Sequence, residues 1–145
     1  MDKTDPPQRF TDTYLLYLVA QASSKASAEF HNSLSKNSIS VSTWRILATL
    51  YPDAPATVGE LAQICMIKQP TMTRQLDRLV SDGLIARHEG QDRRRVVIKL
   101  TPAGKKIAHR LTKTAKAHEA KLLNGLDPDD VARMIETLQK LAHEE

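Results

Sequence analysis

Apolar residues recur at intervals of three and four along much of this chain, which is the spacing that gathers them on one face of an α-helix. The first such run extends from residue 10 to about residue 34 and carries Tyr14, Leu15, Leu18, Ala22, Ala26 and Phe30. A second helix is expected to start after Ser40, which can cap it, and to end before Pro52. Residues 1–9 contain two prolines and little apolar content, so we expect them to form a loose arm.

Two shorter helical segments follow, joined by a tight turn. Thr57 and Glu60 have the spacing of a capping box, in which the threonine oxygen accepts a first-turn N–H and the glutamate reaches back to the threonine N–H. This spacing predicts a helix over 57–65. Pro70 stands in the first turn of the next helix, expected over 68–82. Its buried stripe is expected to be Met72, Leu76, Leu79 and Val80.

The hydrophobic pattern then changes from helical to strand-like. Two β-type runs, 84–88 and 95–100, flank a charged turn that contains Gly90, which predicts a β-hairpin. Thr101 followed by Pro102 is typical of a helix start, and this helix should run to about residue 124. A final helix after Asp127 has the apolar stripe Val131, Met134, Ile135, Leu138 and Leu141. The expected class is mainly α (α+β), with one hairpin among the helices.

Composition supports a helical core. The chain has 145 residues, enough for one compact unit, and its hydrophobic and charged fractions of 41% and 26% are typical of a globular protein. Aromatic residues make up only 4%, so the core must be built from aliphatic side chains and methionine. Such a core suits packed helices better than a β-sandwich.

Positive charge is concentrated in the middle of the chain. Residues 66–113 carry twelve Lys or Arg against four acids, a net +8, whereas the whole chain carries +4. This asymmetry is expected where one part of a fold meets a polyanion, although a solvated basic face would give the same count. The positions of the charges in the predicted elements must therefore distinguish a polyanion-binding surface from a solvated face.

The helix over 68–82 and the basic hairpin after it form the pattern of a winged helix-turn-helix. With the apolar stripe facing inward, the other faces of this helix present donors and acceptors suited to base edges and phosphates. We expect the DNA-contacting residues of this recognition helix to be Lys68, Gln69, Pro70, Thr71, Thr73, Arg74 and Arg78. Arg74 is the first candidate for a guanine or phosphate contact.

The hairpin tip is the second predicted DNA contact. Arg93, Arg94 and Arg95 match the negative potential of a minor groove, and the carboxylate of Asp92 is expected to hold one of them in a fixed pose. A solvated turn is the simpler interpretation of a charge run. The alternative function is a winged helix that binds a protein, with the basic hairpin facing an acidic partner and no specific DNA binding.

Segments that match one known family, in the order of that family, cover nearly the whole chain. They are Thr43-Trp44-Arg45-Ile46-Leu47, Val58-Gly59-Glu60-Leu61-Ala62, Thr73-Arg74-Gln75-Leu76-Asp77-Arg78-Leu79-Val80, Asp82-Gly83-Leu84-Ile85, Asp92-Arg93-Arg94-Arg95 and Lys99-Leu100-Thr101-Pro102-Ala103-Gly104. On these segments the chain resembles the MarR family of winged-helix transcription factors. It departs from the family at Lys68 and Gln69, where an acidic or serine-type start is common, and at Pro70.

The resemblance implies that different segments of the chain serve dimerisation and DNA binding. Residues 10–36 and 102–145 would form a dimerisation base whose helices interleave between two subunits, and residues 40–101 would form the DNA-binding lobe. The homodimer would place two recognition helices in successive major grooves of a pseudo-palindromic double-stranded DNA operator. Regulators with this kind of fold are more often repressors than activators. Half-sites about 34–36 Å apart also agree with the limited number of base pairs that one small module contacts.

The resemblance further implies a small-molecule effector. Members of the family respond to small aromatic acids or their thioesters, bound between base and DNA-binding lobe. His31, Trp44, Arg45 and His109 are the candidate ligand residues, with Arg45 placed to pair with a carboxylate. Core packing or surface solvation is the simpler explanation for each of them.

Other chemistry is disfavoured. The single cysteine, Cys65, excludes an intrachain disulfide and a cysteine-based zinc site, and its apolar neighbours indicate a buried, inert thiol. Five scattered histidines and five glycines provide no metalloprotease spacing, phosphate loop or nucleophile elbow, so we expect no catalysis, metal or cofactor. The chain shows no secretion signal and no run of about 20 apolar residues, so we expect a cytoplasmic protein without a membrane partner.

Overall fold

The computed structural model describes residues 6–92 and 94–143, and contacts divide the chain into two compact units, one up to Val41 and one from Ser42 onward. The first unit contains a short 3-10 helix, η1 (Phe10–Asp12), and the helix α1 (Leu15–Lys36). The prediction of one continuous helix from residue 10 was wrong at its start. The Asp12 carboxylate accepts the N–H of Arg9 at 2.8 Å, which closes a separate turn, and Tyr14 is extended before α1 begins.

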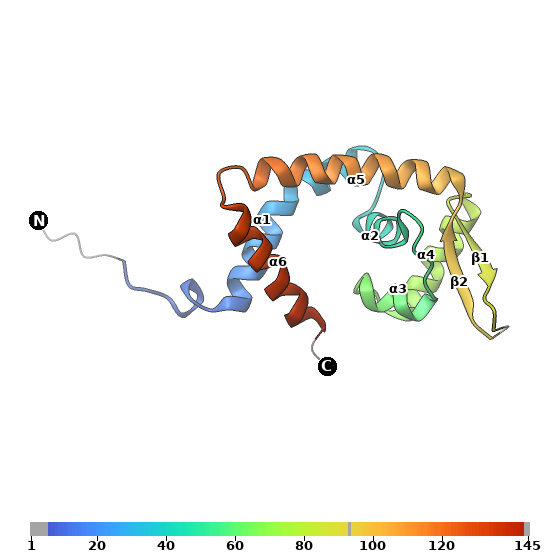
Figure 1. Ribbon diagram of the computed structural model, residues 1–145, viewed down its shortest axis with the longest axis horizontal. Coiled ribbons are helices and arrows are strands. Elements are labelled where there is room, and N and C mark those ends of the chain that lie inside the picture. The colour runs from blue at the N-terminus through green and yellow to red at the C-terminus, as the bar shows by residue number, and fades with distance from the viewer. Residues whose placement is uncertain (1–5, 93, 144–145) are drawn as a thin grey trace, which may run out of the picture. The chain divides into compact units, whose positions relative to one another are not determined.

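The second unit follows the predicted order closely (Figure 1). Apart from Val41, the first residue of α2, it contains the following elements: α2 (Val41–Leu50), α3 (Val58–Ile64), α4 (Gln69–Ser81), β1 (Ile85–Glu89), β2 (Val96–Leu100), α5 (Pro102–Leu122) and α6 (Pro128–His143). The caps predicted at Thr57 and Thr101 are confirmed. Thr57 Oγ1 accepts the N–H of Glu60 at 3.2 Å, and Thr101 Oγ1 accepts the N–H of Gly104 at 3.1 Å.

The core of the second unit is aliphatic. Large side chains from α2, α3, α4 and both strands contribute to it, and the following are at most 2% exposed: Ile46, Leu47, Leu50, Leu61, Met72, Leu76, Ile85 and Ile98. The helix α3 packs against α4 and β2, and α4 also packs against β1. The predicted inward stripe of α4 is confirmed at Met72, Leu76 and Leu79, while Val80 is half-buried. Burial of this stripe fixes which face of α4 remains available to a partner.

The turn between α3 and α4 is tight. Met66 adopts a left-handed conformation with φ of 56°, and the N–H of Ile67 returns to the carbonyl of Ala62 at 2.9 Å. This conformation disfavours a residue with a Cβ by about 1–2 kcal/mol. Packing of α3 on α4 must offset this cost, so the turn holds the two helices of the helix-turn-helix in one arrangement.

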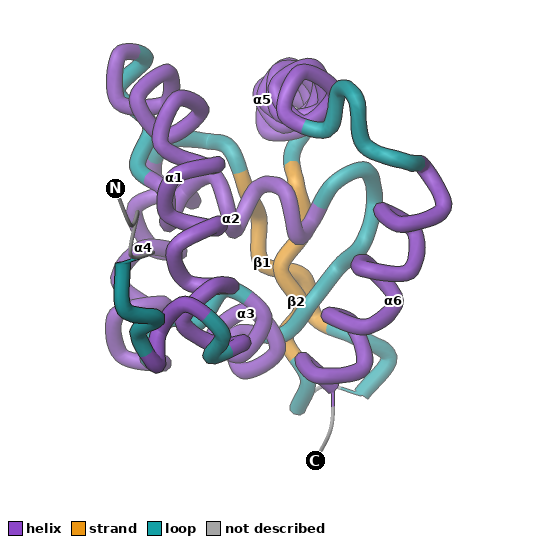
Figure 2. Tube along the Cα trace, turned by 90° about the vertical axis from the view of Figure 1, so that its left-hand side faces the viewer, coloured by secondary structure: helices purple, strands orange, loops and turns teal. Residues whose placement is uncertain are grey.

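The two strands form an antiparallel ribbon, drawn in orange in Figure 2. The register runs from Ile85 opposite Leu100 to Glu89 opposite Val96. A further bridge pairs Ala56, just before α3, with Ile98 of β2: their N–H and C=O groups exchange hydrogen bonds of 2.7 and 3.2 Å. The ribbon is therefore joined to the start of α3 as well as to α4.

The start of α5 is seated directly on the turn that precedes β1. The Leu84 carbonyl accepts the N–H of Thr101 at 3.1 Å, and the Thr101 hydroxyl donates to the Gly83 carbonyl at 2.6 Å. Gly104 approaches the Leu84 carbonyl so closely that a Cβ at this position would lie 1.9 Å from the Leu84 oxygen. The helix thus relies on a missing side chain to approach the turn.

Two helices expose apolar faces. None of the residues of α6 is buried, and Met134, Ile135, Leu138 and Leu141 are between 41% and 50% exposed. The first turns of α1 likewise expose Leu15, Leu16, Tyr17, Leu18 and Val19. Among the described residues, no helix is both long and apolar enough to cross a membrane.

Candidate nucleic-acid interface

The face of α4 opposite the core carries the predicted recognition residues. Of these, Thr71 is half-buried; the exposed ones are Lys68, Gln69, Pro70, Thr73, Arg74 and Arg78. Because Met72, Leu76 and Leu79 hold the other face in the core, this face is presented outward. The structure brings the predicted residues together, and their contact with DNA stays a prediction.

The first turn of α4 has no side-chain cap. Lys68 is the N-cap residue, with φ of −62° and ψ of 141°, and its side chain makes no capping hydrogen bond. Pro70 has no N–H of its own, and the Thr73 hydroxyl donates to the Gln69 carbonyl at 3.1 Å. Helix N-termini favour anions through their main-chain N–H groups and the helix dipole, so a DNA phosphate suits this end of α4.

The guanidinium groups of Arg74 and Arg78 make no ion pair within the described part of the chain. The acid that lies between them on α4, Asp77, is instead paired with Arg87 of β1. Arg87 therefore neutralises the one carboxylate of α4 closest to the two arginines. The outward face of α4 keeps two cations available to an anionic partner.

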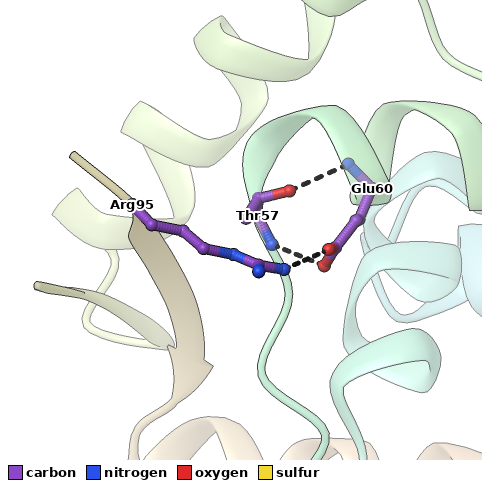
Figure 3. A network of polar contacts seen from close by, with 3 residues as sticks. All are labelled: Thr57, Glu60 and Arg95. Atoms are coloured by element: carbon purple, nitrogen blue, oxygen red, sulfur yellow. Dashed lines mark hydrogen bonds and ion pairs between the residues drawn. The ribbon is translucent and has the colours of Figure 1, made fainter. Parts of the chain in front are cut away.

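The described residues of the wing lie in different surroundings. The Asp92 carboxylate accepts the main-chain N–H of Arg94 at 3.1 Å, so it orders the turn through the backbone. Arg93 lies outside the described residues. The Arg94 side chain is exposed and has no ion-pair partner among the described residues, whereas the Arg95 guanidinium is bound to Glu60 at 2.6 Å (Figure 3).

A cavity of about 430 Å³ lies between the end of α2 and the middle of α5. Its lining residues are Tyr51, Pro52, His109, Thr112, Lys113 and Lys116. The Tyr51 hydroxyl is 2.7 Å from Nδ1 of His109, and the lining contains two ammonium groups and no carboxylate. The arrangement can hold a small organic anion, with its charge near the lysines and its apolar part near the Tyr51 ring.

The predicted ligand residues are only partly associated with this cavity. His109 lines it, whereas Trp44 and Arg45 are half-buried on α2 and do not, and His31 belongs to the other unit. Sequence reasoning missed Lys113 and Lys116. Their spacing from His109 of four and seven residues places all three on one helix face, and this was the available signal.

Cys65 ends α3 in the core and is 1% exposed. Burial raises the pKa of its thiol, while a contact of 3.6 Å with the Thr49 hydroxyl and the positive charge of Arg45 act in the opposite direction. The prediction of a buried thiol is confirmed. No group of three or more His, Cys, Asp or Glu side chains suited to a metal ion occurs among the described residues.

Known proteins share both the sequence pattern and the fold. The MarR family model matches residues 39–97. A MarR family transcriptional regulator from Silicibacter pomeroyi DSS-3 is 36% identical, with 92% of this chain and 96% of that chain covered and a TM-score of 0.80. An uncharacterised HTH-type transcriptional regulator of Bacillus subtilis, YwoH, is 27% identical over 124 residues, which are 85% of this chain and 90% of the relative.

A third similarity is to NadR, solved in complex with 4-hydroxyphenylacetate. It is 25% identical, with 97% of this chain and all of that chain covered and a TM-score of 0.85. The family pattern therefore extends beyond the winged helix to the helices on either side of it. From the shared fold and the 36% identity over almost the full length, we conclude that this chain belongs to the MarR family of transcriptional regulators.

Proposed function

We propose that this protein is a sequence-specific repressor that binds a pseudo-palindromic DNA operator as a homodimer and leaves it when a small aromatic carboxylate, or a related thioester, binds. The observation that carries the proposal is the outward face of α4, where Arg74 and Arg78 have no ion-pair partner in the described structure. Arg94 adds a third such cation on the wing beside it. Exposed arginines kept apart from carboxylates suit phosphates and guanine edges.

The second copy of the chain is proposed as the occupant of the apolar faces of α1 and α6. A single winged helix reads only a few base pairs, and two related by a two-fold axis read both halves of a palindrome. Leu138 and its neighbours on α6 expose apolar surface that a monomer would leave in water. A dimer contact there would remove this surface from water and would also double the number of base pairs that the protein contacts.

We expect two chains to bind each operator duplex, with an affinity that falls steeply with salt. If each chain neutralises three phosphates, the affinity should fall roughly a thousandfold between 50 and 200 mM salt. Leu138→Asp should convert the protein to a single chain of 16.2 kDa and weaken operator binding, because a carboxylate buried in an apolar contact costs several kcal/mol. Light scattering and fluorescence anisotropy measure the mass and the affinity.

The matched control is Gln139→Asp, which adds the same charge to the neighbouring exposed residue of α6. It should keep the parent's mass and affinity. A parent protein that sediments as one chain would contradict the dimer. Salt-independent or absent retention on any duplex at low ionic strength would contradict DNA binding, and would favour the alternative of a protein-interaction module.

The cavity between α2 and α5 is proposed as the effector site. NadR, which has the same fold, is known with 4-hydroxyphenylacetate bound, and an aromatic carboxylate of this kind matches the two lysines and the Tyr51 ring of the cavity. An effector releases DNA only if it binds the DNA-free arrangement more tightly. Lys113 and Lys116 belong to α5, which is seated on the winged helix at Gly104. A shift of α5 on ligand binding would therefore be transmitted directly to the DNA-binding lobe.

Lys113→Gln should weaken the effect of 4-hydroxyphenylacetate about twofold to fivefold, since it removes one exposed charge partner of the carboxylate. The measurement is the ligand concentration that halves operator binding in anisotropy titrations. Lys106→Gln, on α5 but outside the cavity lining, is the control and should leave this concentration unchanged. An equal response of the parent and Lys113→Gln would place the effector elsewhere.

A further inference from the structure

Arg95 differs from the adjacent Arg94 because its charge is already paired within the described chain. It directly precedes β2, and its Nη2 lies 2.6 Å from Oε1 of Glu60 in the first turn of α3. The second oxygen of the same carboxylate, Oε2, accepts the N–H of Thr57 at 3.0 Å (Figure 3). One carboxylate therefore holds both the start of α3 and the side chain at the base of the wing tip.

Two hydrogen-bonded ties join the start of α3 to residues 95–98 in the described structure, and the Arg95 contact with Glu60 is the second. The first is the main-chain pairing of Ala56 with Ile98. Ile98 and Arg95 are three residues apart, about 10 Å along an extended strand. Because β2 is paired with β1 along its length, these two ties attach the whole ribbon to the start of α3, one near its middle and one next to the turn of the wing. Since α3 also packs on α4, the ties hold the wing in a set orientation relative to the recognition helix.

The turn of the wing is built on the main chain of Arg95. The N–H of Gly90 donates to the Arg95 carbonyl at 2.7 Å, and the N–H of Arg95 donates to the Asp92 carbonyl at 2.9 Å. The adjacent residue, Arg94, carries a cation with no ion-pair partner in the described chain. The position of Arg94 thus depends on where Arg95 is held.

We propose that Arg95 is a positioning residue: its ion pair with Glu60 orients the wing so that Arg94 and α4 engage the same stretch of DNA. In this role Arg95 itself does not neutralise a phosphate, which revises its place among the predicted DNA contacts. The inference rests on the proposed DNA-binding function. Side-chain exposures of 61% for Arg95 and 44% for Glu60 mean that the pair stabilises the fold little. Loss of the ion pair should instead weaken DNA binding, because the contact of Arg94 with DNA depends on the orientation of the wing.

The sign of the effect of Glu60→Gln tests the proposal. Glutamine can still serve at this capping-box position, so α3 keeps its start while the charge is lost. Removing an acid near DNA should strengthen binding by electrostatics alone. Loss of positioning should instead weaken it about threefold to tenfold, and Arg95→Gln should weaken it equally. The double variant should be no weaker than either single variant, as measured by anisotropy on the operator.

The control is Glu89→Gln, which removes an exposed acid from the other strand of the wing and should leave binding unchanged or slightly tighter. Glu60→Gln binding as tightly as the parent or more tightly, with Arg95→Gln costing the same in both backgrounds, would overturn the proposal and make Arg95 a direct DNA contact. Amide exchange in the free protein separates this outcome from failure of the proposed function. Exchange at Gly90 should accelerate in Glu60→Gln whether or not the parent binds DNA, and unchanged exchange would contradict the tie.

Discussion

Replacing Gly104 with alanine should destabilise the protein by about 3 kcal/mol, the upper end of the usual cost of overpacking. An added Cβ would lie 1.9 Å from the oxygen and 2.9 Å from the carbon of the Leu84 carbonyl. Both are main-chain atoms, and the oxygen already accepts the N–H of Thr101, so neither can move aside without breaking a contact. The gain of up to about 1 kcal/mol from alanine in a helix offsets only part of this. Urea denaturation measures the change.

Gly59→Ala provides the matched control, since an added Cβ on α3 meets no atom within 4 Å. It should leave the free energy of unfolding unchanged or raise it by up to about 1 kcal/mol. If Gly104→Ala proved as stable as Gly59→Ala, the close approach of α5 to the turn before β1 would be disproved. That result would also remove the rigid link by which α5 is proposed to transmit effector binding.

Arg74→Ala should weaken operator binding by about 1–3 kcal/mol at each half-site, which is roughly fivefold to 150-fold. The Arg74 guanidinium is exposed and lies one turn before Arg78 on the outward face of α4. Its planar fork matches the two acceptors of a guanine edge, which no main-chain donor of α4 replaces. Competition binding with operators changed one base pair at a time measures both the loss and its sequence dependence.

Two outcomes of this experiment are informative. A base contact predicts that Arg74→Ala loses its preference at one base pair, whereas a phosphate contact predicts an equal loss on all sequences. Arg133→Ala is the control: it removes an exposed arginine of α6 that is paired with Asp130, far along the chain from the winged helix. Unchanged affinity of Arg74→Ala would remove this residue from the interface and shift the proposed readout to Gln69 and Thr73.

Local signals in the sequence were sufficient for most helix boundaries. The capping box at Thr57 and the cap at Thr101 act over three residues, so their hydrogen bonds are implied by the sequence wherever the helix forms. The start of α1 was predicted wrongly because apolar spacing continues through residues 10–14. A local carboxylate contact of Asp12 closes a separate turn there, and the periodic pattern does not register it.

Contacts between distant residues account for what the sequence left open at the candidate sites. Glu60 was recognised for its cap, but its second role appears only when β2 brings Arg95 back across 35 residues. In the same way, Tyr51 and His109 meet across 58 residues, and Trp44 and Arg45 are left outside the cavity that His109 lines. Spacing along the chain carries no information on these pairings.

The sequence by itself therefore determined the order of the elements, the inward face of α4 and the family of the chain, because caps, apolar periodicity and turn residues act within a few positions of one another. Only the tertiary structure decided which charges remain available. Asp77 is paired with Arg87 and Glu60 with Arg95, while Arg74, Arg78 and Arg94 are left without ion pairs in the described chain. The physical reason is that charge pairing depends on distance in space, and the packing of α3, α4 and the hairpin sets that distance.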